Sequence, residues 1–163
     1  MLFVNPRSGG NGEDGLDELH DAASRAGADV HVLREGDDLV ELARETSANA
    51  LGMAGGDGSL GTVAGVAIER DLPFVVVPWG TRNHFANDVG LDGDDPVRAV
   101  AAFASGVERS VDVGRAGDRV FLNNVSFGVY ARLVHRRERK RRRGESLARL
   151  RALLISLEDR RWT

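Results

Sequence analysis

The sequence contains no cysteine, which excludes disulfide bonds and thiolate metal sites. It also lacks any apolar run near the roughly 20 residues that a membrane-spanning helix requires. The first five residues, Met-Leu-Phe-Val-Asn, do not carry the basic segment of a secretory signal peptide. These absences lead us to expect a cytoplasmic protein.

Lysine is scarce, since only Lys140 occurs among 22 basic residues, and charge is unevenly distributed. Residues 1–134 carry 11 basic and 21 acidic residues, a net charge of −10, whereas residues 135–163 carry 11 and 4, a net charge of +7. The 163-residue length suits one domain with a buried core, and a hydrophobic content of 42% is ordinary for a globular protein.

Short apolar runs alternate with segments of helical periodicity. The runs predict strands at residues 1–4, 30–33, 50–54 and 74–77, and the periodic segments predict helices at 16–26, 39–43 and 59–70. Gly27 would end the first helix and Asp37 would cap the second. This order predicts an α/β fold with an open, mostly parallel sheet and helices on both faces.

The pattern changes after residue 90. Residues 95–104 predict a helix with Pro96 in its first turn. Residues 110–113 and 120–125 predict strands joined by a turn at 114–119, as in a hairpin. Leucines at positions 147, 150, 154 and 157 form a helical stripe that could cover the chain's own core or a partner chain.

Three loops rich in glycine and polar residues follow predicted strands: loop 1 (residues 5–12), loop 2 (55–59) and loop 3 (78–83). In parallel α/β sheets, ligands bind beyond the carboxyl ends of the strands, where these loops would meet. Glycines allow a phosphate to approach the backbone, and the helix that follows offers free N–H groups. The candidate phosphate-binding residues are Asn5, Pro6, Arg7, Ser8, Gly9, Gly55, Gly56, Gly58, Ser59, Gly80, Thr81, Arg82 and Asn83.

Asp57 is the one acid in these loops. A carboxylate would repel a bare phosphate, so it suits either a bound Mg²⁺ or the role of proton acceptor. The alternatives are structural: Asp57 would cap helix 59–70, Thr81 would cap a helix through Ala86, and loop 1 would be a plain surface loop. His84 is the only histidine near the site, and we expect His20 and His31 to lie unpaired on the surface.

Several motifs in order resemble the diacylglycerol kinase catalytic domain family, which includes bacterial lipid kinases and sphingosine kinases. They are Asn5-Pro6-x-Ser8-Gly9, Gly55-Gly56-Asp57-Gly58-Ser59, Pro78-x-Gly80-Thr81-x-Asn83-x-Phe85-Ala86-x-Asp88-x-Gly90-Leu91, Val111-Asp112-Val113-Gly114 and Phe121-x-Asn123-Asn124-x-Ser126-x-Gly128. The resemblance implies a nucleotide-binding domain like those of phosphofructokinase and NAD kinase over residues 1–131. It further implies transfer of the ATP γ-phosphate to a lipid hydroxyl with Mg²⁺, Asp57 acting near the metal or the hydroxyl. The long Gly-Thr-x-Asn-x-Phe-Ala element favours a lipid kinase over an NAD kinase.

The sequence departs from the family pattern in several respects, of which the largest is its length. Ser59 stands where threonine is usual, a change that keeps the hydroxyl. Gly61-Thr62 stands where an Asn-Glu pair is common, and Trp79 is bulky at a position that is often small. Family members are about twice as long, with a second, β-rich domain that we expect to be missing from this sequence, so residues 132–163 would be a basic tail or a linker to it. The alternative function is therefore a truncated, non-catalytic nucleotide-binding half that needs a partner chain.

Residues 135–143 contain seven basic side chains in nine positions. Such a segment would bring the protein to an anionic membrane surface, which suits a lipid substrate and peripheral location at the membrane. The alternative is a solvated helix or linker. We do not expect nucleic acid as a partner, because the rest of the chain is acidic and no aromatic residue interrupts the basic run.

Overall fold

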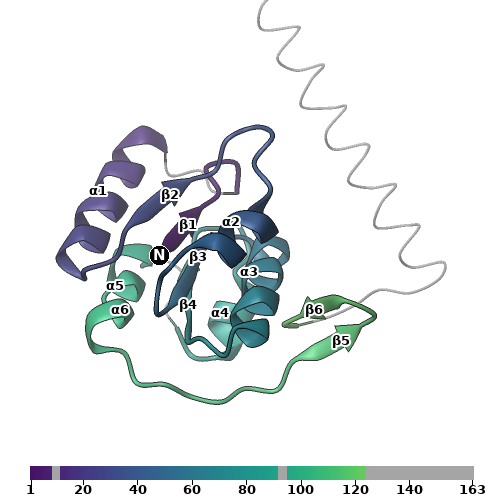
Figure 1. Cartoon of the computed structure of the whole chain (residues 1–163). Helices are drawn as coiled ribbons and strands as arrows, with labels where there is room; N and C mark the ends of the chain where they lie inside the picture. The colour runs from purple at the N-terminus through teal and green to yellow at the C-terminus, as the bar shows by residue number, and fades with distance from the viewer. Residues whose placement is uncertain (9–11, 92–94, 124–163) are drawn as a thin grey trace, which may run out of the picture. The chain divides into compact units, whose positions relative to one another are not determined.

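The structure, a computed structural model, describes residues 1–8, 12–91 and 95–123, which all lie within the compact unit Met1–Asn124. Its centre is a sheet of four strands: β1 (Leu2–Val4), β2 (Val30–Val32), β3 (Leu51–Gly55) and β4 (Phe74–Pro78). The strands lie in the order β2-β1-β3-β4 and all pair in parallel (Figure 1). The predicted open parallel sheet is confirmed.

Helices cover both faces of this sheet, as predicted (Figure 1). The helices α1 (Gly12–Arg25), α5 (Pro96–Val100) and α6 (Ala102–Ser105) lie on one face. On the other face lie α2 (Leu39–Glu45) and α3 (Asp57–Glu69). A further short helix, α4 (His84–Asp88), follows β4.

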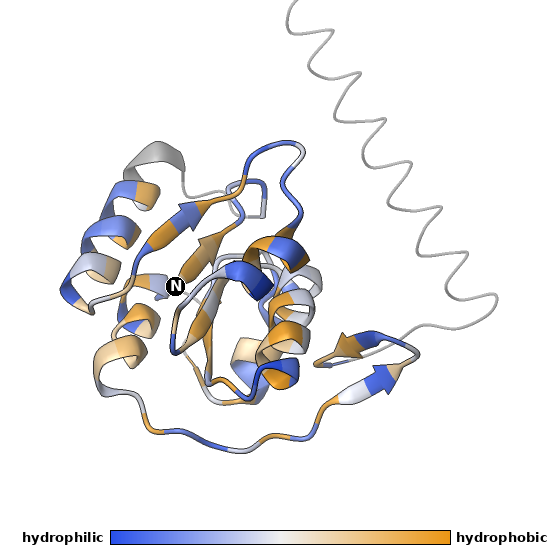
Figure 2. Cartoon of the chain, in the orientation of Figure 1, coloured by the Kyte–Doolittle hydropathy of each residue, from blue (hydrophilic) through white to orange (hydrophobic). Residues whose placement is uncertain are grey.

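Successive side chains of a strand point to opposite faces of the sheet, which divides the core into two layers. Leu2 and Val4 pack with α1 and α5, whereas Phe3, between them, packs with α2 and α3. All three side chains are almost completely buried. Figure 2 shows apolar residues along the strands of the sheet. A parallel sheet with both faces covered needs this two-sided apolar pattern.

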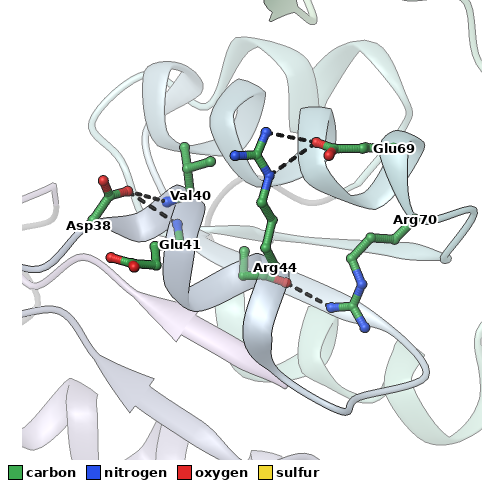
Figure 3. Close-up of polar contacts among 7 residues, drawn as sticks. Asp38, Val40, Glu41, Arg44, Glu69 and Arg70 are labelled. Carbon is green, nitrogen blue, oxygen red and sulfur yellow. Dashed lines mark hydrogen bonds and ion pairs between the residues drawn. The ribbon is translucent and has the colours of Figure 1, made fainter.

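Helix ends follow local chemistry, with one correction to the predicted caps. Gly27 adopts a positive φ of 72° just after α1, as expected of a terminating glycine. The cap of α2 is Asp38 and not Asp37: the Asp38 carboxylate accepts from the Val40 and Glu41 backbone N–H groups (Figure 3). The prediction was wrong by one residue.

Asp37 instead binds the turn that precedes α2. Its carboxylate accepts from the Arg34 backbone N–H at 2.9 Å, and its Oδ2 lies 3.0 Å from His31 Nε2. The Arg34 hydrogen bond is the main reason why the pKa of Asp37 falls below its ordinary value, and His31 lowers it further. The expectation that His31 is unpaired was therefore wrong.

The predictions after residue 90 need two corrections. The helix expected at 95–104 is divided into α5 and α6, although Asp95 caps α5 and Pro96 opens it. The hairpin exists, but its strands are β5 (Gly114–Ala116) and β6 (Arg119–Phe121). Residues 110–113 are exposed and join neither sheet of the described part of the chain.

The hairpin packs on α3 through the helix's glycines. A Cβ added at Gly61 would lie 2.9 Å from the Val120 carbonyl oxygen, so only glycine allows β6 to come this close. Gly65, one turn later, faces the Val120 side chain at ordinary contact distance. The leucine stripe and the basic run lie outside the described residues. Within the described part, no helix is both long and apolar enough to cross a membrane.

Candidate functional site

The three loops meet at one edge of the sheet. Loops 1, 2 and 3 begin at the carboxyl ends of β1, β3 and β4, which are neighbours in the sheet. The register aligns Val4 with Ala54 and Gly55 with Pro78, so the three strands end almost level. The topology thus brings together the segments that the sequence singled out.

Asn5 joins loop 1 to loop 2. Its backbone N–H donates to the Ala54 carbonyl at 2.8 Å, and its side-chain Nδ2 donates to Ser59 Oγ at 3.2 Å. Its Oδ1 accepts from the Arg7 backbone N–H, which closes a tight turn in loop 1. A hydroxyl has one proton and two lone pairs, so Ser59 accepts from Asn5 and keeps its own proton for another acceptor.

Asp57 is the first residue of α3, and its carboxylate forms a hydrogen bond with helix α4. The N-cap of α3 is Gly56, which has no side chain to cap the helix. Asp57 Oδ1 accepts instead from the Phe85 backbone N–H in α4, at 3.2 Å. The interpretation of Asp57 as the cap of its own helix is therefore wrong. The backbone N–H groups of Ser59 and Leu60 both donate to the Gly56 carbonyl, at 2.9 and 3.1 Å.

Loop 3 bends back on itself through Asn83. Asn83 Oδ1 accepts from the Gly80 backbone N–H at 2.8 Å, and the Asn83 side chain is buried. A Cβ at Gly80 would lie 2.8 Å from Gly56 Cα, so loop 3 touches loop 2 at this glycine. Thr81 is not a helix cap as the structural alternative supposed, because α4 begins at His84 with Asn83 as its N-cap.

The remaining candidates differ in exposure. Thr81, Arg82, Pro6, Arg7 and Gly58 are exposed, whereas Ser8 is half-buried and Gly55 is buried. The Arg7 guanidinium lies 3.4 Å from Glu35 Oε2, an ion pair open to solvent on both sides. Gly9 lies outside the described residues.

Two residues within the motif at 78–91 that were not proposed to contact a ligand also shape the site. Trp79, in loop 3, is buried in the core, and Phe85, in α4, supplies the amide that Asp57 binds. The unusual size of Trp79 marked its position in the sequence, but nothing in the sequence pointed to the Phe85 amide, because every residue except proline has one. His84 is exposed.

The donors at this edge fit a magnesium ion held jointly with a phosphate. No group of three or more His, Cys, Asp or Glu side chains suitable for a metal occurs in the described part of the chain. Asp57 is the single carboxylate of the three loops. Mg²⁺ is commonly bound by one or two carboxylates together with substrate phosphates and waters, and Asp57 would supply one such carboxylate here.

The fold and the loops define a parallel α/β domain with a phosphate-compatible site at the carboxyl ends of its strands. Residues 1–116 match the family model described as "Diacylglycerol kinase catalytic domain". The chain therefore belongs to the diacylglycerol kinase catalytic domain family, a family of lipid kinases, as the sequence motifs predicted. Kinase families use ATP, typically with a divalent metal.

Individual relatives agree with this assignment. The chain is 34% identical over 113 residues to a "Probable lipid kinase YegS-like" of Chromohalobacter salexigens, covering 65% of this chain and 36% of that protein. It is 33% identical over 84 residues to a "Diacylglycerol kinase" of Bacillus subtilis, covering 50% and 28%. A diacylglycerol kinase structure from Bacillus anthracis superposes with a TM-score of 0.63 at 26% identity, over 75% of this chain and 45% of the other. The chain thus spans less than half the length of these relatives.

Proposed function

We propose that this chain is the nucleotide-binding part of an ATP-dependent lipid kinase, which transfers the ATP γ-phosphate to a lipid hydroxyl of diacylglycerol type. The observation that carries this proposal is the meeting of loops 1, 2 and 3 at one sheet edge, joined by the Asn5–Ser59 and Asp57–Phe85 hydrogen bonds. Phosphoryl transfer depends mainly on positioning and on neutralising charge. Loops that carry backbone amides, hydroxyl groups and an arginine suit both needs.

Each loop has a distinct role in the proposal. Asn5, Pro6, Arg7, Ser8 and Gly9 of loop 1, and Gly55, Gly56, Gly58 and Ser59 of loop 2, surround the phosphates through backbone amides and hydroxyl groups. In loop 3, Gly80, Thr81 and Asn83 complete the cradle, and the exposed Arg82 supplies positive charge. Asp57 is the proposed catalytic and metal-binding residue, and Mg²⁺ held there would neutralise phosphate charge.

Other elements of the proposal concern the rest of the enzyme. We propose residues 1–131 as the nucleotide-binding domain and residues 132–163 as a basic tail or linker. The relatives extend well beyond the matched segment, so further residues that bind the lipid acceptor are to be sought outside it. Residues 135–143 would contact an anionic membrane, and the protein would be cytoplasmic with peripheral attachment.

Turnover and binding experiments test the proposal separately. The protein is incubated with Mg·ATP and mixed micelles containing diacylglycerol, and lipid phosphate is measured. Binding of Mg·ATP is followed by the emission of Trp79 after Trp162→Phe removes the other tryptophan. Binding with turnover supports the lipid kinase. Binding without turnover favours a nucleotide-binding half that needs a partner chain, and no binding overturns the proposal.

The Asp57→Asn substitution tests the catalytic assignment. Asparagine keeps an Oδ1 that can accept from the Phe85 N–H, so the fold should persist while the negative charge is lost. We expect turnover to fall by about 100-fold or more, the range typical for loss of a group that acts in proton transfer. Wild-type turnover in this variant would remove Asp57 from the chemistry.

A further inference from the structure

Loops 2 and 3 are joined by a closed ring of contacts. Asn83 Oδ1 holds the Gly80 N–H at 2.8 Å, and Gly80 packs directly on Gly56. The next residue, Asp57, accepts from the Phe85 N–H at 3.2 Å, and Phe85 lies two residues beyond Asn83. The ring therefore passes from loop 3 to loop 2 and returns to α4, which directly follows loop 3.

Asn83 occupies an uncommon backbone conformation to make its part of this ring. Its φ of 45° and ψ of 42° lie in the left-handed region, which side chains other than asparagine and aspartate rarely adopt. The left-handed turn directs the side chain back to Gly80 and away from the helix that Asn83 precedes. The Asn83 side chain consequently makes no capping hydrogen bond to α4. The Asp57 carboxylate of loop 2 accepts from the Phe85 N–H in the first turn of this helix instead.

We propose that Asn83 is a positioning residue whose side chain holds loop 3 against loop 2, with Asp57 completing the ring through its Oδ1 atom. Asp57 then has two roles, one structural through Oδ1 and one toward the ligand through its charge. The ring keeps the two loops in a single arrangement before any phosphate arrives, so less conformational entropy is lost on binding. The coupling of the loops stands by itself, whereas its effect on Mg·ATP binding rests on the proposed function.

Substitution of Asn83 tests the ring directly. Asn83→Gly retains the left-handed backbone but removes Oδ1, and Asn83→Asp retains both. Amide hydrogen exchange of Gly80 and Phe85 is measured by NMR in the absence of nucleotide. We expect Asn83→Gly to accelerate exchange at both amides by about fivefold to tenfold, as loss of one part-buried hydrogen bond predicts. Asn83→Asp should restore wild-type protection at both.

The matched control is Asn49→Gly, which deletes the same side chain from an exposed bend outside the loops. It should leave both amides unchanged. The ring is refuted if Asn83→Gly leaves the exchange of either Gly80 or Phe85 unchanged.

A second pair of variants approaches the ring from loop 2. Asp57→Ala removes the acceptor for the Phe85 N–H, whereas Asp57→Asn retains it. Phe85 exchange should accelerate in Asp57→Ala alone, and equal exchange in the two variants would count against the ring. This pair tests the ring even if Asn83→Gly fails to fold.

Binding of Mg·ATP then measures what the ring does for the ligand. We expect Asn83→Gly to weaken binding by about fivefold or more, because the loops must be ordered on binding, with Asn49→Gly at the wild-type value. Unchanged affinity alongside accelerated exchange would overturn the positioning role. A wild-type protein that binds no Mg·ATP would overturn the proposed function, and amide exchange alone would decide whether the loops are coupled.

Discussion

Polar contacts serve different purposes at the loop edge and at the surface where α2 meets α3. At the loop edge, side chains bind backbone amides or hydroxyls in partly buried positions, as Asp57 does with Phe85 of α4. On the α2–α3 surface, Arg44 Nε and Nη2 lie 3.2 and 2.9 Å from Glu69 Oε2, with both side chains 54% exposed (Figure 3). The hydrogen-bond distances alone therefore do not distinguish the two regions.

Their energetic consequences should differ because water can replace one kind of contact and not the other. An exposed ion pair exchanges readily with solvent and stabilises a fold little. A partly buried amide that loses its acceptor remains unsatisfied, which costs more. The glycines of the loop edge add a steric constraint that the helix surface lacks. Arg70 is intermediate, since its Nη1 donates at 2.7 Å to the Ala43 carbonyl near the end of α2 (Figure 3).

Gly80→Ala should have the largest effect among the stability variants. The new Cβ would lie 2.8 Å from Gly56 Cα, and a backbone atom cannot move aside as a flexible side chain can. We expect the free energy of unfolding to fall by about 1–3 kcal/mol, as for other overpacked sites, and Mg·ATP binding to weaken. Urea unfolding measures the first effect and Trp79 emission the second.

Gly58→Ala is the matched control for stability. Gly58 is exposed in the first turn of α3, and a Cβ there would meet nothing within 4 Å. Alanine is favoured over glycine in a helix by up to about 1 kcal/mol, so this variant should be as stable as the wild type or more so. Equal stability of Gly80→Ala and Gly58→Ala would contradict the close contact between loops 2 and 3.

Two glycines on one helix allow a second test of tight backbone contact. Gly61→Ala places a Cβ 2.9 Å from the Val120 carbonyl oxygen, whereas Gly65→Ala places one 3.6 Å from the Val120 side chain. Helix propensity favours alanine equally at both positions, by about 0.5–1 kcal/mol. We expect Gly65→Ala to be stabilised by that amount and Gly61→Ala to be destabilised by about 1 kcal/mol, after the clash outweighs the propensity gain. Urea unfolding curves that rank the two variants in the opposite order would show that β6 does not pack on α3 as described.

The sequence predicted the fold well because burial on both faces leaves a direct mark. Runs such as Phe74 to Val77 have few alternatives to a covered parallel strand, and the order of strands and helices placed the three loops at one edge. One error arose where two adjacent residues could do the same task. Asp37 and Asp38 are both able to cap α2, and only the backbone path decides that Asp38 does so.

The connections within the site were less predictable for a physical reason. The Asp57–Phe85 bond ends on a backbone amide, which carries no residue signature, and it joins positions 28 residues apart. Gly80 and Asn83 were expected to contact a ligand, and no sequence rule indicated that they also bind each other. Asparagine directly before a helix could have suggested a left-handed turn, since that residue tolerates positive φ.

The Arg44–Glu69 pair should give the smallest effect, and its size decides whether the contrast between the two regions holds. A double-mutant cycle of Arg44→Ala, Glu69→Ala and both together isolates the interaction from other consequences of each change. We expect a coupling energy of about 0.2–1 kcal/mol from urea unfolding, falling further when salt is raised because the charges are exposed. A coupling above about 2 kcal/mol, insensitive to salt, would be far outside the range for exposed pairs. The α2–α3 surface would then hold the fold as firmly as the loop edge, and exposure would not be the property that separates them.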